Sequence, residues 1–143
     1  MSTNATTVSA PTFPVLSGGL WVAQGLLAAL FLAAGAMKST SPTADLVANG
    51  LAWVANTPEA LVRFIGVSEL LGAVGLILPS ATRILPWLTP LAAAALTLVM
   101  VLAFGMHAWN GEYTGLPVNV VIGALTAFVA WGRWVKAPIQ GRS

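Results

Sequence analysis

A glutamate within a long apolar stretch is the residue of this sequence best placed to do chemistry. Glu69 lies inside residues 60–78, eleven positions after Pro58. At about 1.5 Å per helical residue, it falls about 16 Å along a helix, close to the midplane of a bilayer. An ionised carboxylate at that depth costs about 2.5–3.5 kcal/mol. We therefore expect Glu69 to face the interior of a helix bundle, where it is either protonated or paired with a cation.

The partner of Glu69 decides between two interpretations. Arg63 lies six positions earlier, which is about 120° around the same helix, so it is poorly placed to reach the carboxylate. Lys38 or His107 could reach it from a neighbouring helix only if their side chains point into the bundle. A carboxyl group that bridges two helices by a hydrogen bond is structural, whereas one that meets a ligand or a proton is functional. The sequence leaves both interpretations open.

Several other polar residues stand where apolar stretches begin or end. Glu59 and Arg63 are spaced i,i+4, which predicts an ion pair on one helix face near the interface. Lys38 either snorkels to the membrane surface or binds a ligand. His107 predicts a hydrogen bond at a helix end or, if functional, a proton donor or a partner of a quinone oxygen. No catalytic residue is assigned. The candidates for ligand binding or proton handling are Glu69, His107, Lys38, Asn119 and Arg63.

The residue types that are absent narrow the chemistry further. The sequence has no cysteine, which excludes disulfides, thiolate metal sites and iron–sulfur clusters. With one histidine, a bis-histidine haem cannot form within a single chain. No phosphate loop, nucleotide fingerprint, HExxH motif, catalytic triad or metal-ligand cluster is present. We therefore expect no metal site and no cofactor of the chain's own, with a quinone as the one cofactor left open.

Composition points to a membrane rather than to water. Hydrophobic residues make up 57% of the chain and charged residues 7%, and the mean hydropathy is +0.86. A soluble domain carries about 25% charged residues, so this chain cannot cover itself with them. Its pI is near 9.7, but the net charge is only +2 and the basic residues are scattered, which excludes a nucleic-acid partner. The expected partner is the lipid bilayer.

Four apolar stretches approach the length of about 20 residues that a membrane-spanning helix needs. They are residues 18–37, 60–78, 86–109 and 116–134. We predict an all-α fold in which these form a four-transmembrane-helix bundle with short loops. The bundle occupies residues 18–134 as one domain, between a flexible N-terminal tail at residues 1–17 and a C-terminal tail at residues 135–143.

Residues typical of helix starts and ends support this division. Thr57, Pro58 and Glu59 are typical of a helix start, and Pro79 with Ser80 predicts the end of the same helix. Residues 45–55 predict a short interfacial helix between the first two spans. The small residues at 34–36 resemble a signal-peptide cleavage site, but residues 1–17 have no positive charge and the apolar run is too long. We therefore interpret residues 18–37 as a spanning helix.

Small residues predict where helices approach one another closely. The second stretch carries a strip of them, and the end of the first stretch offers a complementary surface, as does the alanine run in the third. The strip consists of Gly66, Ser68, Gly72 and Gly75; the complementary surface consists of Ala33, Gly35 and Ala36, and the alanine run occupies residues 92–95. We interpret these as packing residues rather than as a site.

Lysine and arginine placement predicts the orientation. An even number of spans puts both termini on one side, and basic residues favour the cytoplasm. Four of them fall on the side of the termini, Arg83, Arg133, Lys136 and Arg142, against Lys38 and Arg63 on the other. We predict a multi-pass protein of the bacterial cytoplasmic (inner) membrane with both termini in the cytoplasm.

Four segments carry a resemblance to a known family: WVAQGLLA at 21–28, AGAMK at 34–38, LVRFIGVSELLGAVGLILP at 61–79 and PWLTP at 86–90. With these segments, the chain resembles the DoxX-like family of small bacterial membrane proteins. The resemblance covers residues 18–134 and is most specific in the third segment. It implies a four-helix membrane fold with Lys38, Glu69, His107 and Asn119 at family-like positions. The family's named member is associated with a thiosulfate:quinone oxidoreductase, whereas this chain lacks the cysteines of a thiol mechanism.

Three functions follow as hypotheses, and whether the protein is an enzyme stays open. The first is an accessory protein that binds a small hydrophobic ligand, a quinone or a lipid, beside Glu69. The second is the membrane subunit of a quinone-linked oxidoreductase, in which His107 and Glu69 relay protons and a redox partner protein carries electrons. The third is a carrier for a small solute, which would require a homo-oligomer because four helices make a narrow bundle.

Overall fold

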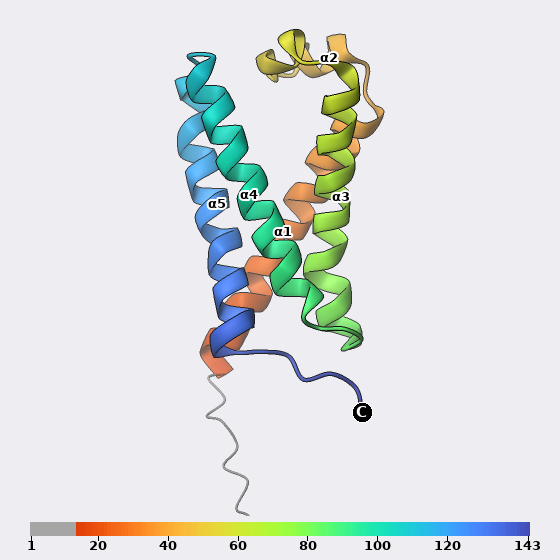
Figure 1. The fold of residues 1–143 in the computed structure, drawn as a ribbon, viewed down its shortest axis with the longest axis vertical. Helices are drawn as coiled ribbons and strands as arrows, with labels where there is room; N and C mark the ends of the chain where they lie inside the picture. Colours follow the sequence, from red (N-terminus) through yellow and green to blue (C-terminus); the bar gives the residue numbers. More distant parts are fainter. Residues whose placement is uncertain (1–13) are drawn as a thin grey trace, which may run out of the picture.

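The computed structural model describes residues 14–143, and regular structure in this part of the chain is entirely helical. Four long helices dominate the fold (Figure 1). They are α1 (Pro14–Thr40), α3 (Glu59–Thr82), α4 (Leu88–Trp109) and α5 (Leu116–Trp131). Long and apolar enough to cross a membrane are α1, α3, α4 and the helical stretch Tyr113–Lys136, which contains α5. The prediction of an all-α bundle with four spans is confirmed.

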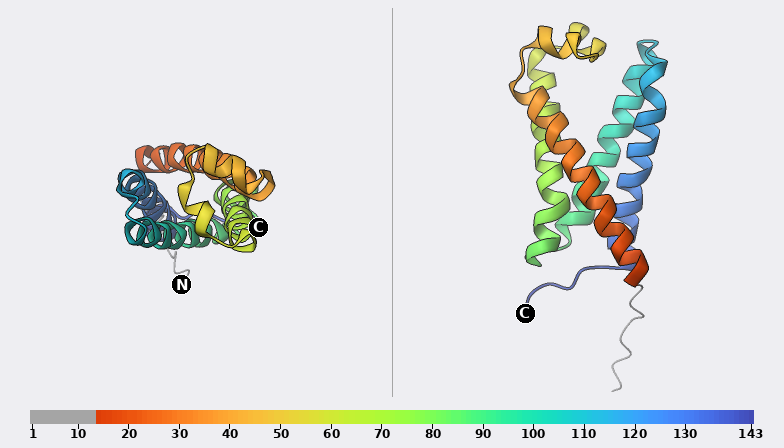
Figure 2. Two further views of the ribbon diagram at one scale, coloured as in Figure 1. Left: turned by 90° about the horizontal axis from the view of Figure 1, so that it is seen from above. Right: turned by 180° about the vertical axis from the view of Figure 1, so that it is seen from behind.

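The long helices are arranged as two antiparallel pairs. α1 packs along α3, and α4 packs along α5, while α3 also contacts α4 and joins the pairs. The pairs lie closest together where α1 begins and α5 ends, and they diverge toward the opposite end (Figure 1, Figure 2). We call these the Arg133 end and the His107 end, after a residue that each contains.

Two short helices lie across the His107 end beside α3 (Figure 1). They are α2 (Thr43–Ala48) and η1 (Ala52–Asn56), where the sequence predicted one interfacial helix. The break falls at Gly50, whose φ of 95° is left-handed and open to glycine. Leu46, Trp53 and Val54 are buried in a small cluster with Val62 of α3, which fixes this cap to the bundle.

Two predicted boundaries differ from the structure. α1 begins at Pro14 rather than at residue 18, and the remainder of the predicted tail, residues 1–13, lies outside the described residues. The prediction that Pro79 ends the second span is wrong, because α3 continues through it to Thr82 and closes on Arg83, whose φ is 58°. Membrane helices tolerate an internal proline because neighbouring helices and local adjustment satisfy the freed backbone groups.

The other end of the chain continues past the last span. α5 passes directly into one π-helical turn, η3 (Gly132–Lys136). Residues 137–143 then run without regular structure across the Arg133 end toward α3 (Figure 1). The backbone N–H of Arg142 donates a hydrogen bond to the carbonyl oxygen of Arg83 at 3.0 Å, which ties this segment to the end of α3.

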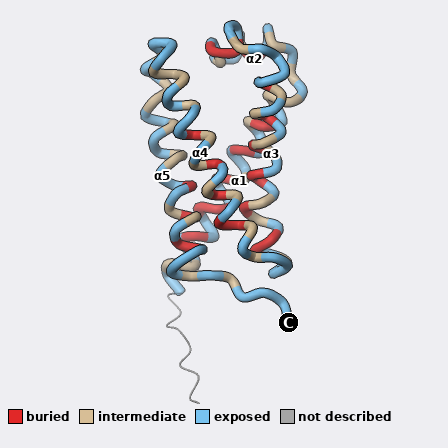
Figure 3. The backbone as a smooth tube through the Cα atoms, viewed as in Figure 1, coloured by how far each residue is buried: buried red, intermediate tan, exposed pale blue. Residues whose placement is uncertain are grey.

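Burial follows the pattern expected of a bundle in lipid. The main core takes residues from all four long helices, among them Leu27, Phe31, Leu76 and Leu96. Buried positions gather toward the Arg133 end, apart from the small cluster that α2 and η1 form with α3 (Figure 3). Large apolar side chains such as Leu102 cover the outside, which suits a hydrocarbon surrounding and not water. The apolar helices therefore support a bilayer environment.

Glycines set the helix separations. α1 and α3 cross so closely at Gly35 and Gly66 that a Cβ atom on Gly66 would lie 2.9 Å from the Gly35 carbonyl oxygen and 2.8 Å from the Ser39 nitrogen. On the same helix, Gly72 meets Leu96 of α4 and Gly75 meets Ala92. The predicted strip of small residues thus contacts two helices: Gly66 packs against α1, and Gly72 and Gly75 pack against α4.

A methyl group at the α1–α3 crossing tests this packing. Gly66→Ala is expected to destabilise the protein by about 1–3 kcal/mol, because two of the three nearest atoms, the Ser39 nitrogen and the Gly35 carbonyl oxygen, belong to the backbone and cannot move aside. Thermal unfolding in detergent measures the change. Gly25→Ala is the matched control, since a Cβ there has nothing within 4 Å. An equal effect of both substitutions would contradict the close contact.

Candidate functional site

Glu69 is paired with Lys38 across the α1–α3 interface. The Lys38 ammonium donates to both carboxylate oxygens at 2.7 Å, and the two side chains are only 12% and 3% exposed. Each residue stands three positions after a glycine of the close crossing, Gly35 or Gly66. Helical side chains lean toward the N-terminus of their own helix, so side chains on antiparallel helices lean toward each other. The helix direction thus brings Lys38 inward instead of letting it snorkel outward.

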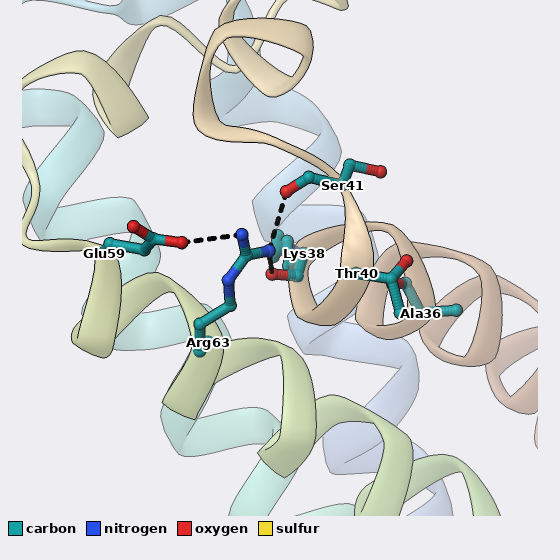
Figure 4. A network of polar contacts seen from close by, with 6 residues as sticks. All are labelled: Ala36, Lys38, Thr40, Ser41, Glu59 and Arg63. Atoms are coloured by element: carbon teal, nitrogen blue, oxygen red, sulfur yellow. Dashed lines mark hydrogen bonds and ion pairs between the residues drawn. The ribbon is translucent and has the colours of Figure 1, made fainter.

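Arg63 secures the end of α1 that carries Lys38 (Figure 4). Its Nη1 donates to the carbonyl oxygens of Lys38 and Ser41 at 2.8 and 2.7 Å. Its Nη2 donates to Glu59 at 2.8 Å, which is the i,i+4 pair that the spacing indicates. Carbonyl groups at a helix C-terminus lack intrahelical partners and attract cations. Arg63 therefore acts as a C-cap for α1 supplied by another helix.

His107 belongs to a separate pair. Its Nδ1 lies 2.6 Å from a carboxylate oxygen of Glu112, in the turn that follows α4. The two side chains are 19% and 26% exposed. Among the described residues, the bonds of Glu69 go to Lys38 and not to His107. The structure therefore does not bring His107 and Glu69 together as one relay.

Asn119, in the first turn of α5, lacks a partner. Its Nδ2 is buried and makes no hydrogen bond in the described part of the chain. Asn119 lines a groove between α4 and α5 with a volume of about 360 Å³. The other walls are largely apolar, including Met100, Val101, Phe104 and Gly123. Asn119 thus lines an apolar groove and carries a buried donor whose hydrogen-bonding capacity is unused.

A second groove lies between α3 and α4. It has a volume of about 490 Å³ and is lined mostly by apolar residues of both helices. Its polar lining residue is Ser68, whose hydroxyl already donates to the Phe64 carbonyl oxygen at 2.8 Å. Glu69 follows Ser68 in sequence, but its carboxylate turns to α1 and does not line this groove. This groove could therefore hold an apolar molecule but has no free polar group to bind it.

One polar cluster was not predicted from the sequence. Gln24 is fully buried, donates to the Leu76 carbonyl oxygen of α3 and accepts from Arg133 Nε at 2.7 Å. The available signal was that Gln24 is the one amide in residues 18–37. Arg133 served in the sequence only as an orientation signal. The two residues are 109 positions apart, and no periodicity predicts such a contact.

The candidate site offers ion pairs, interhelical hydrogen bonds and apolar grooves. In residues 14–143, no group of three His, Cys, Asp or Glu side chains lies close enough to hold a metal ion. Several of the described polar groups join helices, among them Lys38 with Glu69 and Gln24 with Arg133. Together, the fold and these contacts define a small multi-pass membrane protein with a buried ion pair and lateral apolar grooves.

The family follows from comparison with known proteins. A model of the DoxX-like family matches residues 22–129, so the chain belongs to the DoxX-like family. No curated protein and no solved structure matches it. The matched range includes Lys38, Glu69, His107 and Asn119 and leaves out Arg133.

Breaking the buried pair tests its role. Lys38→Met leaves the Glu69 carboxylate unpaired inside the bundle and is expected to destabilise the protein by about 3–5 kcal/mol. The double variant Lys38→Met, Glu69→Leu removes both charges and is expected to cost less than Lys38→Met alone. Unfolding free energies of the two single variants and the double variant form the cycle. Additive effects would show that the two residues do not interact.

Proposed function

We propose that this DoxX-like protein is a non-catalytic binding protein that holds a small hydrophobic molecule, a quinone or a lipid, in the α4–α5 groove. The observation that carries the proposal is the unpaired Nδ2 of Asn119 at the groove wall. An unsatisfied buried donor costs about 1–3 kcal/mol. A ligand with an acceptor oxygen removes that cost when it binds. The groove volume also falls in the range of about 300–1,000 Å³ that small-molecule sites occupy.

The ligand position differs from the one expected beside Glu69. Both oxygens of Glu69 accept hydrogen bonds from Lys38, so a ligand there would have to displace a strong ion pair. Asn119 needs no such exchange. The Lys38–Glu69 pair and Arg63 instead hold α1 against α3, while the neighbouring pair α4–α5 carries the site.

The chemistry of the groove selects the ligand class. Nδ2 donates to an oxygen acceptor, which a quinone carbonyl and a lipid ester carbonyl both provide. An apolar tail or ring then lies along Met100, Val101 and Phe104, with Gly123 leaving room. A polar head near the end of a span and an apolar body along it match the way such molecules lie in a bilayer.

A second candidate is the membrane subunit of a quinone-linked oxidoreductase. The short His107–Glu112 contact at the same end of the bundle is the observation that favours it, because a histidine–carboxylate pair can pass a proton to a quinone as the quinone is reduced. A partner protein must then supply the electrons. Copurification of a redox-active protein from the native membrane would support this candidate, and isolation of the chain alone in a quinone-binding form would support the first.

Replacing Asn119 tests the proposed site. Asn119→Leu is expected to weaken binding of a short-chain ubiquinone, measured by calorimetry in detergent, about tenfold or more, because one hydrogen bond is lost. Ser68→Ala in the α3–α4 groove is the matched control and should leave the affinity unchanged. A parallel titration with a monoacylglycerol, which has an ester carbonyl and no quinone ring, distinguishes lipid from quinone.

Stability separates loss of the site from loss of the fold. Asn119→Leu removes an unpaired donor, so the ligand-free variant should melt at the same temperature as the parent or higher. Unchanged affinity in a folded Asn119→Leu variant would remove Asn119 from the site, and an equal loss in Ser68→Ala would place the ligand elsewhere.

We also propose that the Arg133 end lies in the cytoplasm of a bacterium with its inner membrane around the bundle. Lys38 and Arg63, the two basic residues toward the other end, are both bound to carboxylates. The four at the Arg133 end have no Asp or Glu beside them in sequence. This distribution supports cytoplasmic termini through the positive-inside rule.

Thiol labelling tests the orientation, since the chain has no cysteine of its own. In intact cells, a membrane-impermeant maleimide is expected to label Thr114→Cys at the His107 end and to spare Gln140→Cys at the Arg133 end. Permeabilised cells should label both. The reverse pattern would invert the proposed orientation.

A further inference from the structure

Charge is distributed unequally between the two ends of the bundle. All four acidic residues lie in the half of the protein toward the His107 end: Asp45, Glu59, Glu69 and Glu112. Four basic residues lie at the Arg133 end: Arg83, Arg133, Lys136 and Arg142. The chain therefore supplies no Asp or Glu side chain to neutralise the cations of the Arg133 end.

Arg133 is the cation for which this matters most. It is 3% exposed, and its partners in the described part of the chain are neutral: Gln24 Oε1 at 2.7 Å, Ala137 O at 3.2 Å and Ser17 Oγ at 3.3 Å. Its Nη2 is buried and has no partner at all. Burying a charge without a counter-ion is strongly unfavourable. The guanidinium therefore has both the charge and a free donor for an anion from outside the chain.

Tryptophans place this guanidinium at the level of lipid headgroups. The Trp21 ring lies 5.2 Å from the Arg133 guanidinium carbon, and the Trp131 ring lies 5.7 Å from the Lys136 ammonium. Trp134 is next to Arg133 in sequence and is exposed. Tryptophan collects at the membrane interface. An anion that reaches Arg133 at this depth is one that the membrane surface itself presents.

We propose that Arg133 and Lys136 form a binding site for the phosphate group of an anionic phospholipid. The planar fork of a guanidinium suits phosphate oxygens, and the free Nη2 supplies the donor that the intramolecular contacts leave unused. Lys136 adds a second positive charge one helical turn away. Clusters of basic side chains beside a span attract anionic headgroups.

The segment at residues 137–143 begins beside this site. Ala137, where it begins, contacts Arg133 through its carbonyl oxygen, and the segment crosses the Arg133 end without regular structure (Figure 1). A hydrogen bond from Arg142 to Arg83 holds its far end. Approach of a headgroup to the buried guanidinium from this side requires a displacement of Ala137.

Lipid-dependent stability tests the proposal. The full chain in neutral detergent is titrated with phosphatidylglycerol or with phosphatidylcholine, and thermal unfolding and native mass spectrometry are recorded. Phosphatidylglycerol is expected to raise the melting temperature of the parent more than phosphatidylcholine does. In Arg133→Gln its apparent affinity should fall about tenfold or more, because a charge-assisted hydrogen bond is lost. Arg83→Gln removes the same charge from an exposed residue at the same end and should retain the parent affinity.

Three results would overturn the proposal. They are an unchanged affinity in Arg133→Gln, an equal loss in Arg83→Gln, and protection by millimolar inorganic phosphate that equals protection by the lipid, which would assign the site to free phosphate. Should Arg133→Gln fail to fold, Arg133→Lys keeps the charge and loses the planar fork. It is expected to bind phosphatidylglycerol several-fold more weakly than the parent, and undiminished binding would equally refute the site.

Discussion

Hydrocarbon supplies no hydrogen-bond partner, and this constraint governs every polar side chain of the bundle. Glu69 can stay within a span because Lys38 meets both of its oxygens. That meeting depends on the close crossing of α1 and α3 at Gly35 and Gly66, which the ion pair in turn holds together. The close packing of α1 on α3 and the Lys38–Glu69 ion pair therefore depend on each other. Arg63 adds to this contact by capping α1 from the neighbouring helix.

The same constraint makes the unsatisfied groups informative. In the described part of the chain, the buried side-chain atoms without a partner are Ser39 Oγ, Asn119 Nδ2 and Arg133 Nη2. Ser39 is enclosed by the α1–α3 crossing, where the space beside Gly66 is taken. The other two lie near opposite ends of the α5–η3 segment, one beside an apolar groove and one among neutral acceptors. The two groups suited to a ligand, Asn119 Nδ2 and Arg133 Nη2, thus lie on the side of the bundle away from the Lys38–Glu69 ion pair.

Much of the fold was predictable because hydropathy and length alone identify a span. Pro79 misled the prediction of a helix end because its effect depends on the neighbours of α3, not on local sequence. The candidate site was only partly predictable. The sequence named Lys38 and His107 as partners for Glu69 but could not choose, since the choice depends on helix direction and register. The bond between Gln24 and Arg133 joins opposite ends of the sequence, and no local pattern encodes it.

The segregation of charge has an electrical consequence. The half toward the His107 end holds four carboxylates against Lys38 and Arg63, whereas the Arg133 end holds four cations and no Asp or Glu side chain. The molecule is therefore polarised along the membrane normal. A voltage that is negative inside acts on each charge by about 2.3 kcal/mol per 100 mV for a full crossing. An energised membrane thus favours one insertion direction for this protein, and this bias vanishes when the membrane is depolarised.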